Sequence, residues 1–385
     1  MNPVERMTVW LERHWATPSY GGWLLAFLSA FFFGAATNTM AGWLYVMSGV
    51  IAALLLVSAI VPGRTLRQLR ISRSPIAPVS TGDPLLIEVQ VENPTSRAKP
   101  LIQIQDQLPK SLAKEPVQTS IEFIPPRTTH QWLYRQPTLK RGVYRWQNLE
   151  LRTGNPFGLF WSRRDRDVKA KAIVYPTVLP LNSCPLVDEI GREEDPRFPS
   201  AIRSQTSTEG LTRALRPYRW GDPTRLIHWR TSARYGELRV RELEVFTGGQ
   251  ELVIALDSAA SWNLDYFEQA VIAAVSLYFY SLRQRQSVQV WTAGTDLLRG
   301  DRQVLEALAE TQAKEPLKAD LPPDLPLIWL TQNSTSLTTL PTGSRWALWP
   351  TIAPSSATPG DPIASRGLIV IPDAPLQPQL QGPLQ

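Results

Sequence analysis

The sequence predicts a chain of three parts: an apolar helical hairpin, a β-rich middle and a C-terminal half of mixed α/β type. Residues 15–63 contain no charged residue, alternating apolar and polar residues recur in short runs between 85 and 175, and continuous apolar runs alternate with helical patterns after 251. The length of 385 residues allows an anchor and two modest domains, and 34 prolines favour short strands and loops over a helical bundle. The net charge of +6 does not by itself require nucleic acid, and a lone cysteine, Cys184, excludes an intramolecular disulfide.

The N-terminal part, residues 1–63, contains two apolar segments at 21–37 and 41–61. Each is close to the ~20 residues that cross a bilayer as a helix, and the short connector predicts an antiparallel hairpin. Four glycines would let the two helices approach closely: Gly21, Gly22, Gly34 and Gly42. A cleaved signal peptide is the competing interpretation, but a second apolar segment follows directly. Arginines flank the hairpin and the connector has none, so we expect a multi-pass plasma-membrane protein with both termini in the cytoplasm.

The middle part, residues 64–180, has the period-two alternation of strands that are covered on one side. The expected strands are 85–92, 101–105, 121–123, 131–135, 144–151 and 172–175. Turn residues separate them, which predicts a two-sheet sandwich of immunoglobulin-like type. A basic cluster follows the fifth strand: Arg163, Arg164, Arg166, Lys169 and Lys171. It is interpreted as a solvated sheet edge, with attraction to anionic lipid left open.

The C-terminal part, residues 248–372, alternates strands and helices. Strands are expected at 252–256, 288–291, 327–330, 346–349 and 368–371, and helices at 269–282 and 303–313. This alternation predicts a doubly wound, mostly parallel sheet, and Asp257 follows the first strand at the edge where ligands gather. The last residues, 373–385, are expected to be loose.

An arginine-rich segment, residues 181–247, lies between the two soluble parts. Its arginines are interleaved with aromatic side chains, and Gly221-Asp222-Pro223 predicts a tight bend between two short arms. Three interpretations remain open. The arginines pair with acids of the chain itself and clamp two domains together, they bind phosphate or nucleic acid, or they dock an acidic partner protein.

The stretch LRPYRWGDPTRLIHWRTSAR, followed by ELRVRELE, resembles the signature of the bacterial membrane-protein family called domain of unknown function 58. The matching residues are Leu215, Arg216, Tyr218, Gly221, Asp222, Arg225, Ile227, His228 and Trp229. The resemblance implies paired membrane helices, a β-rich middle and a C-terminal domain similar to von Willebrand factor type A. The candidate partner-binding or interdomain residues are Arg216, Tyr218, Gly221, Asp222, Arg225, His228, Trp229 and Arg230.

The same resemblance bears on metal binding. Type A domains that hold Mg²⁺ carry Asp-x-Ser-x-Ser after the first strand, whereas this chain has Asp257 and Ser261 with Ala259 between them. A second acidic ligand, expected in Leu-Thr-Asp, is replaced by Gln332. These two departures leave only a degenerate candidate site at Asp257 and Ser261, where bound Mg²⁺ is not expected.

The favoured function is a scaffold that faces the cytosol, binds a partner protein and catalyses nothing itself. The resemblance implies a MoxR-type AAA+ ATPase or a transglutaminase-like protein as the partner. One alternative is a hydrolase or anion-binding enzyme, with His228 near Asp222 as general acid or base and the arginines holding an anionic substrate. The other alternative is phosphate or nucleic-acid binding by the arginine cluster.

Overall fold

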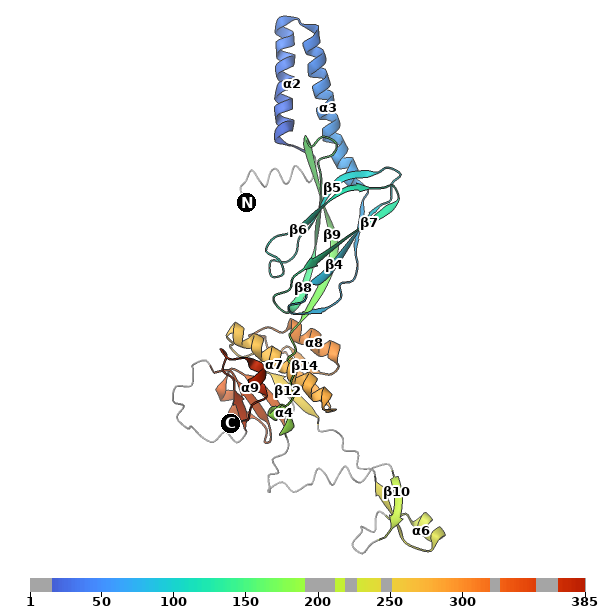
Figure 1. The fold of residues 1–385 in the computed structure, drawn as a ribbon, viewed down its shortest axis with the longest axis vertical. Helices are drawn as coiled ribbons and strands as arrows, with labels where there is room; N and C mark the ends of the chain where they lie inside the picture. The colour runs from blue at the N-terminus through green and yellow to red at the C-terminus, as the bar shows by residue number, and fades with distance from the viewer. Residues whose placement is uncertain are drawn as a thin grey trace. The chain divides into compact units, whose positions relative to one another are not determined.

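The computed structural model describes residues 16–190, 212–218, 227–243, 251–318, 326–350 and 366–384, with the backbone alone for 212–216 and 241–243. The chain divides into two compact units, residues 1–176 and 177–385 (Figure 1). The first unit holds the helical hairpin and the sandwich, and the second holds the parallel sheet.

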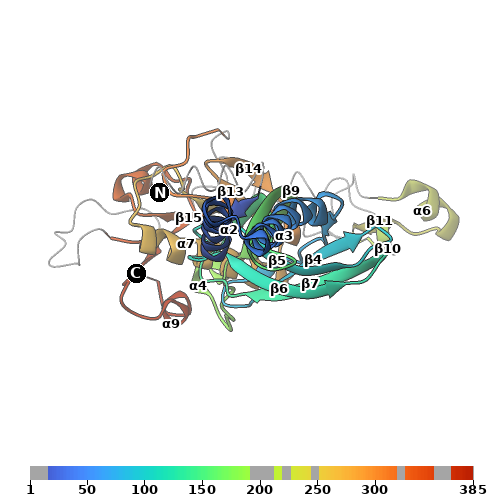
Figure 2. The same cartoon turned by 90° about the horizontal axis from the view of Figure 1, so that it is seen from above.

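Helices α2 (Tyr20–Thr39) and α3 (Gly42–Arg67) form the hairpin and lie side by side (Figures 1 and 2). Both helices are long and apolar enough to cross a membrane. Helix α2 begins where the Ser19 hydroxyl accepts the Gly22 N–H at 3.3 Å, an N-cap that satisfies one free helix donor. It ends at Met40, whose left-handed backbone turns the chain directly into α3.

Serines rather than glycines hold the two helices together. The Ser29 hydroxyl donates to the Ser48 carbonyl at 3.0 Å, and the Ser48 hydroxyl donates back to the Ser29 carbonyl at 2.9 Å. A Cβ atom added at Gly34 or Gly42 would meet nothing within 4 Å, so glycine-mediated approach of the helices was a wrong expectation. Hydroxyl exchange of this kind joins helices where water is absent.

The strands of the first unit form a sandwich of two mainly antiparallel sheets. One sheet has the order β2 (Arg70–Arg73), β4 (Leu85–Asn93), β7 (Thr128–Gln136). The other has the order β1 (Thr17–Pro18), β9 (Phe160–Tyr175), β8 (Gly142–Thr153), β5 (Lys99–Asp106), β6 (Val117–Ile124), and β3 (Val79–Ser80) pairs with β9. Alternate residues of β4 are fully buried, which confirms the predicted alternation and the two-sheet sandwich.

A buried polar network joins the two sheets around Asp106 on β5. The Asp106 carboxylate binds the Arg73 guanidinium at 2.7 Å and accepts hydrogen bonds from Tyr134 Oη at 2.8 Å and Trp146 Nε1 at 3.0 Å. Asp106 is fully buried, and burial raises the pKa of its carboxyl, while Arg73 and the two donors oppose that rise. Removing any one partner of such a buried charge is expected to destabilise the fold.

The second unit contains a six-stranded sheet in which only one strand is antiparallel. The strand order is β14 (Thr295–Leu298), β13 (Val288–Thr292), β12 (Leu252–Leu256), β15 (Leu327–Thr331), β16 (Arg345–Leu348), β17 (Gly367–Ile369). All neighbours are parallel except β13 and β14, so the predicted mostly parallel sheet is confirmed. Every residue of β12 is buried, as expected for a central strand.

The helices of the second unit favour one face of this sheet. Helices α4 (Pro185–Asp188), α7 (Leu264–Arg283), α8 (Asp301–Glu310) and α9 (Leu376–Leu380) all contribute to the core cluster that contains Leu252, Ile254 and Leu256. The opposite face carries a stacked pair, Trp291 and Trp329, and within the described residues its buried cluster includes no α-helical residue. The expected helices on both faces are therefore not seen in this part of the chain.

Two expected boundaries differ from the structure. Residues 181–190, which the sequence grouped with the arginine-rich segment, belong to the core of the second unit through Leu181, Leu186 and Val187. The tail beyond residue 373 was predicted to be loose, but α9 packs its Leu380 side chain into the same core. Composition misled the prediction because a few well-placed leucines are enough to dock a short polar helix.

Candidate functional site

The arginine-rich segment forms a small hairpin. Strand β10 (Thr212–Pro217) pairs antiparallel with β11 (Arg239–Leu243), and the short helix α6 (Trp229–Tyr235) precedes β11. The Tyr218 N–H donates to the Leu238 carbonyl, and Ile227 forms a bridge with Val240. Two arms are present as predicted, the predicted bend at Gly221-Asp222-Pro223 lies outside the described residues, and α6 was not predicted.

His228 has a structural position at the start of α6. Its Nδ1 accepts the Thr231 N–H at 3.2 Å and lies 2.6 Å from the Thr231 hydroxyl, so the ring caps the helix. Acceptance by Nδ1 places the ring proton of a neutral imidazole on Nε2. Its backbone is also engaged: the N–H donates to the Arg239 carbonyl, and the carbonyl accepts from the Ser232 hydroxyl at 3.0 Å. Sequence reasoning missed Thr231, although the spacing of three residues is that of a capping pair.

Several other side chains of the hairpin are exposed. Trp229 is 65% exposed, Tyr235 is 59% exposed and Leu238 is 44% exposed. Arg230 and Arg234 are exposed as well. We call these five residues the hairpin patch. It combines the three residue types, Trp, Tyr and Arg, that contribute most often to protein interfaces.

Arg239 is already paired within the hairpin. Its guanidinium binds Glu237 at 2.7 Å and lies 4.4 Å from the centre of the Tyr235 ring. Gly236, with φ of 72°, ends α6 in a left-handed conformation that favours glycine. The contacts of the hairpin therefore fix its backbone and Arg239, but leave the patch open.

The predicted site residues are only partly described. Gly221, Asp222 and Arg225 lie outside the described residues, as does the side chain of Arg216. Tyr218 is half-buried, and Trp229 and Arg230 are exposed. The pairing of His228 with Asp222, on which the enzyme hypothesis depended, thus stays a prediction.

The second candidate site lies at the carboxyl ends of β12 and β15. Asp257 Oδ2 accepts the Thr331 hydroxyl at 2.7 Å, and the Asp257 carbonyl accepts from Trp262 Nε1 at 2.6 Å. The Gln332 side-chain oxygen accepts the Asn263 N–H at 2.7 Å, just before α7. Burial raises the pKa of Asp257, and the Thr331 hydroxyl opposes that rise.

The candidate ligand atoms at this site do not fit Mg²⁺. The ion prefers several oxygen ligands with near-octahedral geometry, and carboxylates usually supply its protein ligands. Here Asp257 already accepts the Thr331 hydroxyl, the Gln332 amide oxygen is used by Asn263, and Ala259 has no side-chain oxygen. Ser261 is exposed. Among the described residues, no group of three or more His, Cys, Asp or Glu side chains is placed to hold a metal.

Both candidate sites fall within one region that matches a protein-family model. Residues 214–338 match the family model described as "Protein of unknown function DUF58". This DUF58 region begins in β10 and reaches η2 (Ser334–Thr339), so it includes the hairpin patch and Asp257. No curated protein sequence matches the chain.

Two solved structures are similar to part of the chain, and both are of the CARDB domain of PF1109 from Pyrococcus furiosus. The solution NMR structure is 12% identical, covers 26% of this chain and 94% of that chain, and has a TM-score of 0.19. The crystal structure, in complex with di-metal ions, is 13% identical, covers 27% of this chain and 93% of that chain, and has a TM-score of 0.18.

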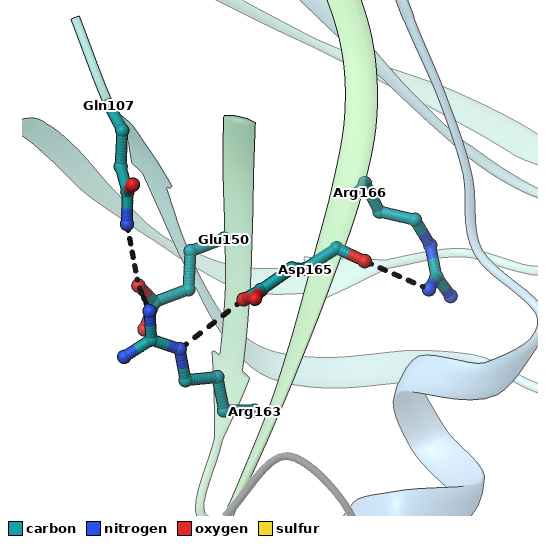
Figure 3. Close-up of polar contacts among 5 residues, drawn as sticks. All are labelled: Gln107, Glu150, Arg163, Asp165 and Arg166. Carbon is teal, nitrogen blue, oxygen red and sulfur yellow. Dashed lines mark hydrogen bonds and ion pairs between the residues drawn. The ribbon is translucent and has the colours of Figure 1, made fainter. Parts of the chain in front are cut away.

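Outside the DUF58 region, part of the basic cluster on β9 serves the sandwich itself (Figure 3). Arg163 binds Glu150 at 2.7 Å and Asp165 at 3.3 Å, and Gln107 donates to Glu150 at 3.3 Å. Arg166 donates to the Leu66 carbonyl of α3 at 3.1 Å. These two arginines hold β8, β9 and the end of α3 together, so their charge is engaged within the unit.

Replacing Asp257 with asparagine is expected to stabilise the second unit at neutral pH. Because burial raises the pKa of this carboxyl in the folded protein, the carboxyl stabilises the fold fully only below its pKa in the unfolded chain, about 4. This stabilisation is lost as the pH rises through the pKa of the carboxyl in the folded protein. The gain in the variant should therefore shrink towards low pH. The rate at which a thiol reagent labels buried Cys184, compared between variant and wild type at each pH, measures this difference.

An exposed carboxylate supplies the control for this experiment. Asp296 is exposed, so Asp296→Asn should leave the labelling rate unchanged at every pH. A gain for Asp257→Asn that grows towards low pH would contradict the assigned cause. Adding Mg²⁺ should leave the labelling rate of the wild type unchanged.

Proposed function

We propose that this protein is a membrane-anchored docking protein that binds a partner protein through the hairpin patch and has no catalysis of its own. In this proposal α2 and α3 anchor the chain, the sandwich acts as a spacer, and the second unit is a domain similar to von Willebrand factor type A. The parallel sheet, with an aspartate at the carboxyl end of its central strand, supports that similarity.

The exposed side chains of the hairpin helices support membrane anchoring. Trp23, Phe27 and Phe31 are 67%, 72% and 59% exposed, which is costly in water and favourable in lipid. The last turn of α3 carries Arg64 and Arg67, whereas the connector between the helices has no basic residue. By the positive-inside bias, both termini and both soluble units face the cytoplasm.

The hairpin patch is the observation that carries the docking function. A two-stranded hairpin with a short helix has little core of its own: Ile227, Val240 and Ser232 are buried, yet Trp229 and Tyr235 remain largely in solvent. Partner binding would bury these aromatic side chains. Arg230 and Arg234 bring positive charge to the patch, and the neighbouring acid, Glu237, is paired with Arg239, so the fitting partner surface is acidic.

The partner expected from the resemblance is a MoxR-type AAA+ ATPase, with a transglutaminase-like protein as the second choice. The patch supports a protein over nucleic acid because it pairs two arginines with three large apolar or aromatic side chains. A hydrolase using His228 is less well supported, because Nδ1 is occupied by the helix cap.

A photo-cross-linking amino acid placed at Trp229 in cells tests the proposal. We expect a covalent adduct with one acidic protein, identified by mass spectrometry. Adding Arg230→Glu and Arg234→Glu should lower the adduct yield about tenfold or more, because charge complementarity is reversed. The same cross-linker at exposed Asp296 serves as the matched control and should give no such adduct.

Three outcomes would count against the proposal. Adducts only with other residues of the same chain would indicate a clamp between domains. A nuclease-sensitive adduct would indicate nucleic-acid binding. An adduct unchanged by the two charge reversals would show that the patch does not select the partner.

A further inference from the structure

One end of the sandwich lies next to the start of α2 and the end of α3. Strands β4, β6 and β8 run towards this end, and the antiparallel strands β5, β7 and β9 run away from it. The connecting loops 94–98, 125–127 and 154–159 therefore meet there. We call this region the helix-proximal end.

Direct contacts fix its position against the helices. The Ser19 N–H donates to the Leu159 carbonyl at 2.8 Å, and the Leu159 carbonyl also lies against Gly22. A Cβ atom at Gly22 would collide with that carbonyl, which explains the glycine. Since Ser19 caps α2, loop 154–159 lies at the level where the first apolar helix begins.

The side chains of this end combine exposed apolar and basic groups. Phe157 is 57% exposed and Leu101 is 55% exposed. Arg97 and Arg127 are exposed on the two other loops, and the three loops contain no aspartate or glutamate. An apolar ring flanked by cations, on loops without an acid, is suited to the boundary between anionic headgroups and acyl chains.

The apolar surface continues into the wall of the sandwich. A cavity of about 200 Å³ opens between β5, β6 and the loop that carries Phe157. Pro156 and Gly158, on either side of Phe157, line it together with Leu101 and Trp161. Exposed and recessed apolar groups are therefore contiguous at this end.

We propose that the helix-proximal end docks on the phospholipid headgroup layer of the bilayer that α2 and α3 cross. Phe157 inserts at the level of Tyr20 and Trp23, which are 86% and 67% exposed, and Arg97 and Arg127 bind anionic lipid phosphates. This inference rests on the membrane anchoring proposed above. Docking would orient the sandwich on the membrane, beyond merely tethering it.

A nitroxide spin label at Phe157→Cys tests insertion in the full chain, reconstituted into nanodiscs of equal parts phosphatidylcholine and phosphatidylglycerol. The native Cys184 is buried, so labelling is selective for the new cysteine. We expect the label to be shielded from a water-soluble nickel complex and accessible to oxygen. The matched control is Ser111→Cys, an exposed position between β5 and β6 at the opposite end, where nickel should have free access.

A third label at Val50→Cys, 60% exposed in the middle of α3, separates two failures. If Val50 lies in the acyl region while the labels at 157 and 111 are equally open to nickel, headgroup docking is wrong and anchoring stands. If the label at 50 is also open to nickel, anchoring fails, and the proposed function fails with it.

The role of the arginines needs a separate comparison. Arg97→Glu with Arg127→Glu should increase nickel access to the label at 157 several-fold in nanodiscs with phosphatidylglycerol and much less in phosphatidylcholine alone. Lys114→Glu, exposed at the opposite end, is the matched charge reversal and should change nothing. An equal response in both lipids would overturn the binding of anionic phosphates.

Discussion

Replacing Asp106 with alanine is expected to destabilise the sandwich by about 3–5 kcal/mol, because Arg73 would keep its charge in the core without a partner. Arg73 Nη2 binds Asp106 at 2.7 Å, and the side chain of Arg73 is 2% exposed. Tyr134 and Trp146 would lose their acceptor at the same time. Amide hydrogen exchange in β4, β5 and β8 should accelerate between a hundredfold and a few thousandfold.

Two further variants make this prediction specific. Asp83 is exposed, so Asp83→Ala should leave exchange in the sandwich within a fewfold of the wild type. The double variant Arg73→Met, Asp106→Leu should lose less stability than Asp106→Ala, because it removes both charges together. A double variant as unstable as the single one would show that packing, and not the unpaired charge, determines the loss.

The second large effect is expected for Trp349→Ala in the second unit. Trp349 is fully buried, its Nε1 donates to Gln269 Oε1 at 3.1 Å, and its ring lies 5.8 Å from that of Trp262. Truncation of a buried tryptophan costs about 3–5 kcal/mol through lost apolar contact and the cavity left behind. Cys184 lies in the same core, and burial raises its pKa to about 12, so its labelling reports opening of this unit.

Labelling of Cys184 should be slow in the wild type and faster in Trp349→Ala by a hundredfold to a few thousandfold. Trp229→Ala removes the same side chain at an exposed position and should change the rate by no more than a fewfold. If both tryptophan variants labelled at the wild-type rate, the assignment of Trp349 and Cys184 to one cooperative core would be wrong.

The hairpin shows how far the candidate site could be predicted from the sequence. Tight turn residues and flanking arms predicted a bend, and the mixture of arginine and aromatic residues predicted a binding surface. The sequence alone did not single out capping by His228, because a histidine followed three residues later by threonine is compatible with catalysis as well as with capping. The structure shows the capping contact, because α6 brings the Thr231 N–H to Nδ1.

Residues 85–175 and 251–371 show what the sequence by itself determined: strands of alternating burial in the first range and a mostly parallel sheet in the second. These features follow from local hydrophobic periodicity, which is visible in any short window. Only the tertiary structure decided that Asp106 meets Arg73 across 33 residues, that Asp257 meets Thr331 across 74, and that the Leu159 loop lies against Ser19. Such pairs depend on strand register and on how distant segments pack, and neither leaves a periodic signal in the chain.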